Sequence, residues 1–159
     1  YGTETMHLLR AEKGYILVGQ DTDGTVTPLD LNLNWMIGKK KKDFIGKRSL
    51  TRSDIIRGDR KQLVGLVPIN KTYGIEEGQQ VIEEEDLSTP IKKPIKMLGH
   101  VTSSYFSPTL NQCVAMALVK GGNRKIGSQL FVSTSNLNTI AVEVVTPNFV
   151  DPKNERLTS

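Results

Sequence analysis

The sequence has few of the residues on which several classes of protein depend. It contains one cysteine, Cys113, which excludes an internal disulfide, and two histidines, His7 and His100, which make no zinc site with it. No apolar run approaches the ~20 residues of a membrane-spanning helix, and the N-terminus lacks the basic and apolar pattern of a secretory signal. We therefore expect a soluble, cytoplasmic protein that binds no metal.

Patterns that carry chemistry are also scarce. The sequence has no nucleophile and base at a recognisable spacing and no glycine-rich loop for phosphate, so it gives no catalytic residue. The run Lys39–Lys42 lacks the interleaved aromatic residues of a nucleic-acid surface, which argues against a nucleic-acid partner. Such a run is typical of a solvated loop, with a site for a polyglutamyl tail or an acidic partner surface as the alternative. The residues alone thus indicate a binding domain.

The length of 159 residues suits one domain with an appended segment, because such a chain buries roughly 70% of its unfolded surface. The net charge is +4, and all of the excess lies in residues 1–62, which hold 12 basic and 8 acidic residues. A modest positive field of this kind favours an anionic partner or simply solubility. Because the chain begins at Tyr1 and not at methionine, we expect it to be a piece of a longer polypeptide.

Residues 1–60 carry mixed signals for helix, strand and turn. Thr3 as N-cap and Gly14 as a stop bound a short amphipathic helix, and the pair Asp23-Gly24 predicts a turn. Apolar and polar residues alternate around Trp35, which we expect to anchor this front part on its neighbour. The other expected elements are a brief strand over 15–18, a half-buried strand over 30–38 and a helix over 46–56.

Residues 61–150 show the alternation and turn signals of antiparallel β structure. The stretch from Gly99 to Gly122 predicts a strand, a long ordered loop broken at Ser107-Pro108, and a second strand covered on both faces. A small closed barrel suits these strands, because closure leaves no open sheet edge. Strands are expected over 63–67, 80–83, 96–103, 115–120, 129–133 and 140–145, with turns over 83–86 and 136–138.

The predicted fold class is α+β, with a short helical or mixed N-terminal segment followed by a small antiparallel β-barrel domain. The change from mixed patterns to strands lies at 58–61 and divides the chain into residues 1–60 and 61–150. After Pro147 the composition becomes polar, and we expect the tail over 151–159 to be loosely held.

Several blocks of sequence carry a resemblance to a known family. The pattern G-x-V-T-S-x-x-x-S-P-T-L at Gly99–Leu110, followed by a small-residue apolar strand, resembles the C-terminal domain of glycine-cleavage T-proteins, the aminomethyltransferases. The blocks Leu9–Tyr15, Val18–Pro28 and Asp43–Leu50 resemble the version of this domain at the end of the alpha subunits of heterotetrameric sarcosine oxidases. Together the blocks follow the expected order over most of residues 2–150.

This resemblance implies a part of an oxidoreductase that binds tetrahydrofolate. In such an oxidase the end of the alpha subunit holds tetrahydrofolate, which captures the one-carbon unit from oxidative demethylation of sarcosine as methylene-tetrahydrofolate, mainly through proximity and shielding from water. Flavins and NAD belong to the parent complex. The implied partners are the beta, gamma and delta subunits and the preceding region of the alpha subunit. The chain would then supply one wall of a folate pocket and be inactive alone.

The resemblance points to Arg10, Glu12 and Tyr105 as the residues of this wall. A guanidinium at Arg10 would hold a folate carboxylate or carbonyl through two parallel hydrogen bonds. The alternative is that Arg10 complements the helix dipole and pairs with Glu12 or Asp21.

Three other functions stay open at this point. The chain is alternatively a fragment of a stand-alone T-protein, which accepts a lipoyl-bound aminomethyl group, or a structural interaction module with vestigial folate contacts. Asp21 and Asp23 also resemble the first motif of haloacid-dehalogenase-type phosphatases, in which the first Asp attacks phosphorus and the second is a general acid. That phosphatase fold requires alternating strands and helices, whereas the sequence after residue 60 favours strands and turns.

Overall fold

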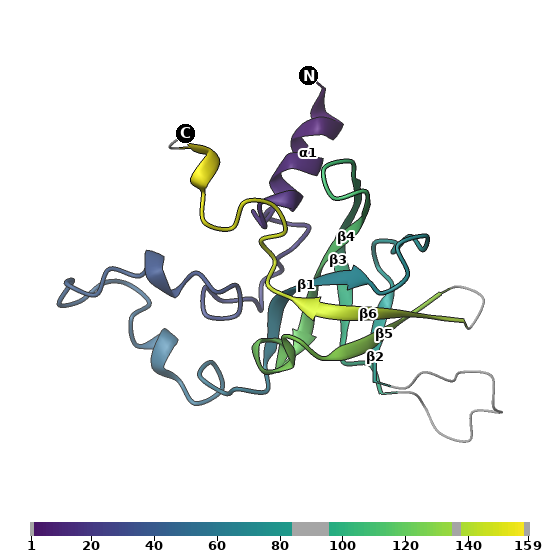
Figure 1. Cartoon of the computed structure of the whole chain (residues 1–159). Helices are drawn as coiled ribbons and strands as arrows, with labels where there is room; N and C mark the ends of the chain where they lie inside the picture. The colour runs from purple at the N-terminus through teal and green to yellow at the C-terminus, as the bar shows by residue number, and fades with distance from the viewer. Residues whose placement is uncertain (1, 84–95, 135–137, 158–159) are drawn as a thin grey trace.

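The computed structural model describes residues 2–83, 96–134 and 138–157, and these form a closed barrel of six antiparallel strands with a short helix beside it (Figure 1). The order around the barrel is β1-β4-β3-β2-β5-β6, and β6 closes it by pairing with β1. The strands are β1 (Lys61–Pro68), β2 (Gln80–Ile82), β3 (Gly99–Ser107), β4 (Gln112–Lys120), β5 (Gln129–Ser133) and β6 (Thr139–Val145).

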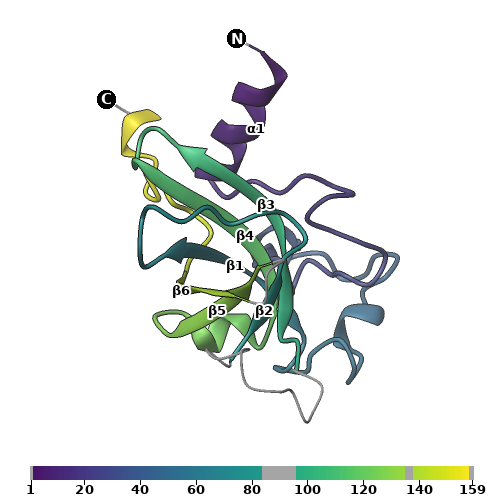
Figure 2. The same cartoon turned by 90° about the vertical axis from the view of Figure 1, so that its right-hand side faces the viewer.

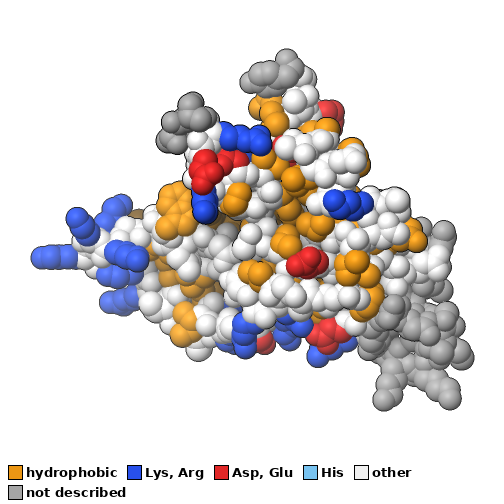
Figure 3. Space-filling model, in the orientation of Figure 1, with side chains coloured by type: hydrophobic (Ala, Val, Ile, Leu, Met, Phe, Trp, Pro, Cys, Tyr) orange, Lys and Arg blue, Asp and Glu red, His pale blue; other side chains and the backbone are white. Residues whose placement is uncertain are grey.

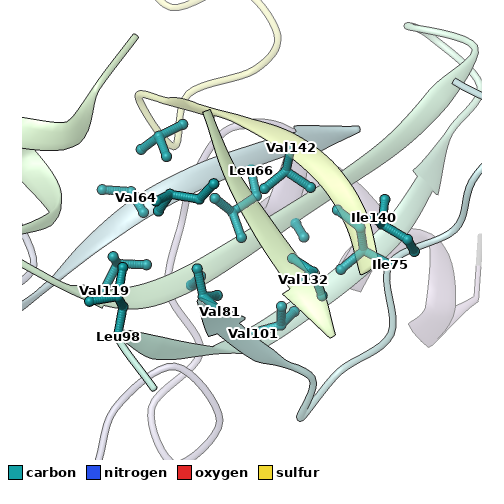
Figure 4. Close-up of a cluster of buried hydrophobic side chains, with 14 of the residues drawn as sticks. Val64, Leu66, Ile75, Val81, Leu98, Val101, Val119, Val132, Ile140 and Val142 are labelled. Carbon is teal, nitrogen blue, oxygen red and sulfur yellow. The ribbon is translucent and has the colours of Figure 1, made fainter. Parts of the chain in front are cut away.

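The interior of the barrel is filled by branched apolar side chains, among them Val64, Leu66 and Val142 (Figure 4). Because successive residues of a strand point to opposite faces, the neighbouring residues lie outside. Leu63, Met116 and Leu118 point outward from β1 and β4 and form a second buried cluster with Ala11 and Leu31 of the N-terminal part. Strand β4 is therefore covered on both faces, as its sequence predicts.

The closed antiparallel barrel and its six strands are confirmed, with changes at their ends. β3 begins at Gly99 instead of residue 96 and continues to Ser107, where it pairs with Gln112 of β4. The predicted long loop between these strands is therefore wrong, since only residues 108–111 separate them. Of the predicted turns, residues 84–86 and 136–137 lie outside the described residues.

The helix α1 (Thr3–Glu12) confirms the predicted N-terminal helix, but it begins at a different cap. Gly2 occupies the N-cap position, and no side chain caps the helix. α1 contacts the hairpin of β3 and β4, which extends beyond the rest of the barrel (Figure 2). Only its last turn is buried, whereas Met6 and Leu9 are 56% and 51% exposed. None of the described helices is long and apolar enough to cross a membrane.

The two strands predicted before residue 40 are wrong. Residues 15–17 have no regular structure and residue 18 begins a turn, while residues 30–38 contain turns, irregular positions and a 3-10 turn at Asn34–Met36. Asn32 has a φ of +60°, which an extended strand cannot contain, and the closed barrel offers no free edge for pairing. Trp35 is 76% exposed, so it does not anchor this part of the chain on its neighbour.

The helix predicted over 46–56 is also wrong. Gly46 has a φ of +92°, outside the right-handed helical region, and the extended backbone of Arg52 ends a 3-10 turn at Ser49–Thr51. Apolar residues in this stretch therefore do not gather on one helical face.

The C-terminal segment crosses back over β1 and reaches the end of α1. Phe149 packs against Gly65, where a Cβ atom would lie 2.8 Å from its ring. Lys13 Nζ donates to the backbone oxygen of Asp151 and to Oδ1 of Asn154, both at 2.7 Å. The expectation of a loosely held tail is therefore wrong at Asp151 and Asn154, which these bonds tie to the end of α1.

Candidate functional site

A β-bulge in β3 aims two neighbouring hydroxyl groups at one carboxylate. The register between β3 and β4 shifts between Val101 and Ser103, so the usual alternation of side chains is broken there. Thr102 and Ser103 are both buried, and their hydroxyls donate to Oδ1 of Asp21 at 2.5 and 2.6 Å. The Leu17 N–H donates to Oδ2 of the same carboxylate at 2.8 Å. Asp21 lies in the turns after α1 and is fully buried, and these three donors satisfy its carboxylate.

The guanidinium of Arg10 completes this cluster. Its Nη1 donates to Oδ2 of Asp21 at 2.5 Å and to the Tyr15 backbone oxygen at 3.3 Å. Its Nη2 donates to Oγ of Ser103 at 2.8 Å and to Oε1 of Gln20 at 3.2 Å. The four terminal N–H groups thus all have acceptors, while the buried Nε has no hydrogen-bond partner among the described residues.

We call Arg10, Asp21, Thr102 and Ser103 the Asp21 cluster. It buries one positive and one negative charge together, with the Arg10 and Asp21 side chains 13% and 0% exposed. A buried pair of this kind tolerates desolvation because the charges neutralise each other and hydrogen bonds satisfy the carboxylate. The cluster therefore fixes the end of α1, the following turn and β3 in one arrangement.

Tyr105 lies beside the cluster, two residues beyond Ser103 on β3. Cζ of Arg10 is 5.6 Å from the centre of the Tyr105 ring, a distance at which a cation and an aromatic ring attract each other. The half-buried ring also packs against the outer apolar cluster that contains Met116. Tyr105 therefore presents aromatic surface next to a charged group.

Glu12 belongs to a separate junction at the end of α1. Its side chain is 4% exposed and accepts a hydrogen bond from Oγ of Ser107 at 2.5 Å. Its backbone oxygen accepts from the N–H groups of Phe149 and Val150 at 3.0 and 2.9 Å. Glu12 thus joins α1 to the end of β3 and to the C-terminal segment.

Two hollows lie elsewhere on this part of the molecule. The larger, about 1120 Å³, separates residues 13–36 from the C-terminal segment and is mostly apolar, with Tyr15, Trp35, Met36 and Ile126 in its walls. The smaller, about 340 Å³, is lined largely by charged residues, among them Asp30, Arg60 and Lys61, and His100 also lines it. Neither hollow is lined by Arg10, Glu12 or Tyr105.

An ion pair forms one wall of the smaller hollow. Arg60 donates through Nη2 to Oδ2 of Asp30 at 2.7 Å and through Nε to Oδ1 at 2.8 Å. Burial on its own would raise the pKa of Asp30, but hydrogen bonds from Arg60 and Thr27 hold that pKa below its ordinary value. Burial lowers the pKa of His100 in the same hollow, so its imidazole is neutral at pH 7.

The structure brings Arg10 and Tyr105 together and places Glu12 in a different junction. It also realises the pairing of Arg10 with Asp21, which the sequence left open as an alternative. Sequence reasoning did not assign Thr102, Ser103 or Ser107 to either network. All three belong to the motif at Gly99–Leu110, which was the one available signal. Whether Arg10, Glu12 and Tyr105 contact folate stays a prediction.

The phosphatase alternative is wrong. Asp21 cannot attack phosphorus because its carboxylate is fully buried and engaged by Arg10 and two hydroxyl groups. A general acid needs a raised pKa, whereas hydrogen bonds from the Thr25 side chain and N–H hold the pKa of Asp23 below its ordinary value. The described strands are also all paired antiparallel, with no alternation of parallel strands and helices.

Comparison with known families and structures matches both parts of the chain. The model of the glycine cleavage T-protein C-terminal barrel domain matches residues 61–151, and that of the GCVT N-terminal domain matches residues 1–41. The crystal structure of glycine cleavage system aminomethyltransferase T from Bartonella henselae is similar, with a TM-score of 0.75 and 28% identity over 92% of this chain and 38% of that chain.

Two kinds of curated protein are among the relatives of this chain. Sarcosine oxidase subunit alpha of Corynebacterium sp. (strain P-1) is 45% identical over 98% of this chain, and that of Rhizobium meliloti is 35% identical over 99%. The chain spans 16% of the length of each of these subunits. The aminomethyltransferase of Thermosipho melanesiensis is 38% identical over 72% of this chain and 28% of its own length.

The barrel-domain match covers more than half of the chain, and the strands of the structure occupy the same range. The chain therefore belongs to the family of the glycine cleavage T-protein C-terminal barrel domain.

Proposed function

We propose that this chain is the C-terminal portion of a sarcosine oxidase alpha subunit and forms part of its tetrahydrofolate-binding region. The observation that carries the proposal is the similarity to such subunits, which extends over 98% of the chain at 45% identity. The parent protein would be an oxidoreductase. Its tetrahydrofolate would capture the one-carbon unit from sarcosine as methylene-tetrahydrofolate, and the flavins and NAD would belong to other parts of the complex.

In this proposal Arg10 and Tyr105 would contact one edge of a folate molecule. Tetrahydrofolate has aromatic rings and carboxylate groups, and the half-buried Tyr105 ring lies beside the Arg10 guanidinium. A folate oxygen would replace Gln20 at Nη2 of Arg10, because that 3.2 Å bond is the longer of the two at this nitrogen and Gln20 also bonds to the exposed Glu77. Glu12 would hold the wall in place through Ser107.

No described residue of this chain is proposed to act as an acid or base in the capture. Asp21 is neutralised by Arg10, and Glu12 is buried against Ser107. These residues would orient one face of the folate and exclude water from it, which suits a step that depends on proximity. The preceding region of the alpha subunit would supply the rest of the pocket.

The test uses the complete alpha subunit assembled with its partner subunits. We expect sarcosine-dependent formation of methylene-tetrahydrofolate. We also expect weaker tetrahydrofolate binding in two variants: Arg10→Lys, which keeps the positive charge but loses the two parallel donors of the guanidinium, and Tyr105→Leu, which keeps an apolar side chain but loses the aromatic ring. Lys153→Gln, an exposed change on the C-terminal segment, serves as the control. Dissociation constants equal to wild type in both test variants would remove Arg10 and Tyr105 from the site.

A stand-alone aminomethyltransferase is the second candidate function. The similarity to the Thermosipho melanesiensis protein and to the Bartonella henselae structure favours it. It predicts that the complete protein accepts an aminomethyl group from a lipoyl carrier without sarcosine. Transfer from the lipoyl carrier, together with no product from sarcosine, would replace the first proposal with this one.

A further inference from the structure

The chain carries a strongly basic stretch that the functional site does not use. Residues 39–57, which we call the basic arm, contain eight Lys and Arg residues and two Asp residues, a balance of +6. The whole chain has a net charge of only +4. In Figure 3 the blue side chains gather at the end of this projecting part of the molecule.

The basic arm has no core of its own. From residue 32 to residue 60 no side chain is buried, and the only regular structure is two 3-10 turns, Asn34–Met36 and Ser49–Thr51. The arm projects from the barrel as an extended loop (Figure 1). A segment of this length that buries no side chain gains little from folding by itself, so contacts with another surface are needed to offset the entropy of ordering it.

The basic arm also exposes large apolar side chains. Ile45 is fully exposed, at 105%, and Ile56 is 61% exposed. Lys39–Lys42 are exposed, and their side chains form no ion pair among the described residues. Arg52 and Arg57, by contrast, pair with Asp54 and Asp59. Exposed isoleucines on the same loop as unpaired lysines have the composition of a protein contact with an apolar centre and a charged rim.

We propose that the basic arm docks on another subunit of the assembly, on a surface that presents carboxylates around an apolar patch. This inference rests on the proposed function, because it requires an assembly of subunits. Carboxylates on the partner would face Lys39–Lys42, and the apolar patch would cover Ile45 and Ile56. The complementary charges would mainly speed and orient association, while the buried isoleucines would hold the complex together.

The composition of the arm favours a protein surface over a free anion. A polyglutamate tail would need the positive charges alone and would leave Ile45 and Ile56 exposed to water. The basic residues are also spread along an extended loop, and of the eight only Arg57 lines either of the two hollows described above. Both features suit a broad surface and not a small ligand.

Cross-linking of the purified complex tests the location of the arm. A carbodiimide joins lysines directly to carboxylates that touch them, so Lys39–Lys42 are expected to link to Asp or Glu residues of another subunit. Links from these lysines only to the alpha subunit itself would overturn the proposal in favour of an internal contact. An alpha subunit that purifies without any partner would instead contradict the proposed function.

Variants of the complete alpha subunit test the two kinds of contact. The charge variant carries Lys40→Glu and Lys41→Glu, and the apolar variant carries Ile45→Ser and Ile56→Ser. Each should weaken association with the partner subunit about tenfold or more. The charge variant should also lower the salt dependence of association. The matched controls are Lys71→Glu and Ile69→Ser, which are exposed outside the arm and should assemble as wild type. Wild-type affinity in both arm variants would overturn the proposal, and loss of affinity in the controls alone would place the contact elsewhere.

Discussion

Arg10 and Asp21 meet at 2.5 Å between the last turns of α1 and the loop after it, and the Asp21 side chain has no exposure to solvent. The two hydroxyl groups that also bind this carboxylate come from consecutive residues of β3, which only the bulge allows. The carboxylate thus holds together three segments that are distant in the sequence. Such a pair fixes one arrangement, and the loss of either partner leaves a buried charge alone.

Asp21→Asn should therefore lower the free energy of unfolding strongly. The change leaves the Arg10 guanidinium without its counter-charge and turns an amide toward hydroxyl donors, so we expect a loss of about 3 kcal/mol or more. Urea denaturation followed by circular dichroism measures it. Asp23→Asn is the matched control, because Asp23 is exposed and its hydrogen bonds are to the neighbouring Thr25 and Val26, so the change should affect stability little. Equal stability of the two variants would show that the cluster contributes nothing to folding.

Ser103→Ala tests the two hydrogen bonds that the Ser103 hydroxyl makes at the bulge. Oγ of Ser103 both donates to Asp21 and accepts from Arg10, so its removal leaves two buried polar groups short of a partner. The expected loss is about 1–3 kcal/mol of unfolding free energy, measured by the same denaturation. The exposed Ser53→Ala should lie within about 0.5 kcal/mol of wild type. A Ser103→Ala protein as stable as Ser53→Ala would mean that water or relaxation replaces the hydroxyl.

The barrel could be predicted from the sequence because its signals are local. Inward residues such as Val64 and Leu66 recur with period two, and glycines at the strand ends mark the turns. β4 is a short apolar run that ends at a Gly pair, and it has covering side chains on both faces. A closed barrel then follows, since an antiparallel sheet of this size otherwise leaves two open edges.

Residues 13–60 could not be predicted in the same way, because long-range contacts decide their structure. Leu31 and Leu33 alternate with polar residues as in a strand, yet Asn32 between them adopts a left-handed conformation and its side chain donates to the Leu63 backbone oxygen. Trp35 was expected to anchor this part of the chain because apolar and polar residues alternate around it, and it is exposed. Neither result follows from local propensity.

The candidate site was predictable in part. The sequence named Arg10 and Asp21 as a possible pair, and the structure confirms that pairing. It could not show that Thr102 and Ser103 share a target, because three consecutive hydroxyl residues do not reveal which one is bulged. The register of a strand is set by its neighbours, here β4, and not by its own composition.

Acid should destabilise the protein partly through Asp30. Its pKa is lowered in the folded chain, so the unfolded chain takes up a proton at higher pH, near the ordinary value of about 4. The stabilisation that the Asp30 carboxylate provides is therefore complete above that pH, and it is lost as the pH falls through the pKa of Asp30 in the folded chain.

Urea midpoints measured from pH 7 to pH 3 test this effect. Asp30→Asn should be less stable than wild type at pH 7, and the difference should shrink as the pH falls below about 4, because the wild-type carboxyl is then protonated as well. Asp54→Asn, at an exposed carboxylate, should run parallel to wild type. A constant difference between wild type and Asp30→Asn across this range would contradict the predicted linkage.

Gly65→Ala should release the C-terminal segment from the barrel. A Cβ atom at residue 65 would lie 2.8 Å from the Phe149 ring and 2.8 Å from the Thr146 backbone oxygen, and backbone atoms cannot move aside as a flexible side chain does. We expect a loss of about 1–3 kcal/mol in unfolding free energy. The amide hydrogens of Phe149 and Val150, which bond to the Glu12 oxygen, should also exchange faster.

Gly24→Ala is the control for this change, since a Cβ atom there meets nothing within 4 Å and the residue needs no left-handed backbone. It should leave stability unchanged or raise it by about 0.4–1 kcal/mol, because alanine reduces the freedom of the unfolded chain.

Replacing the ring as well, in Gly65→Ala with Phe149→Ala, should cost less than the two separate losses added together, because each change removes the same contact. Strictly additive losses would mean that the segment is held without Phe149 and that Lys13 and Glu12 alone attach it.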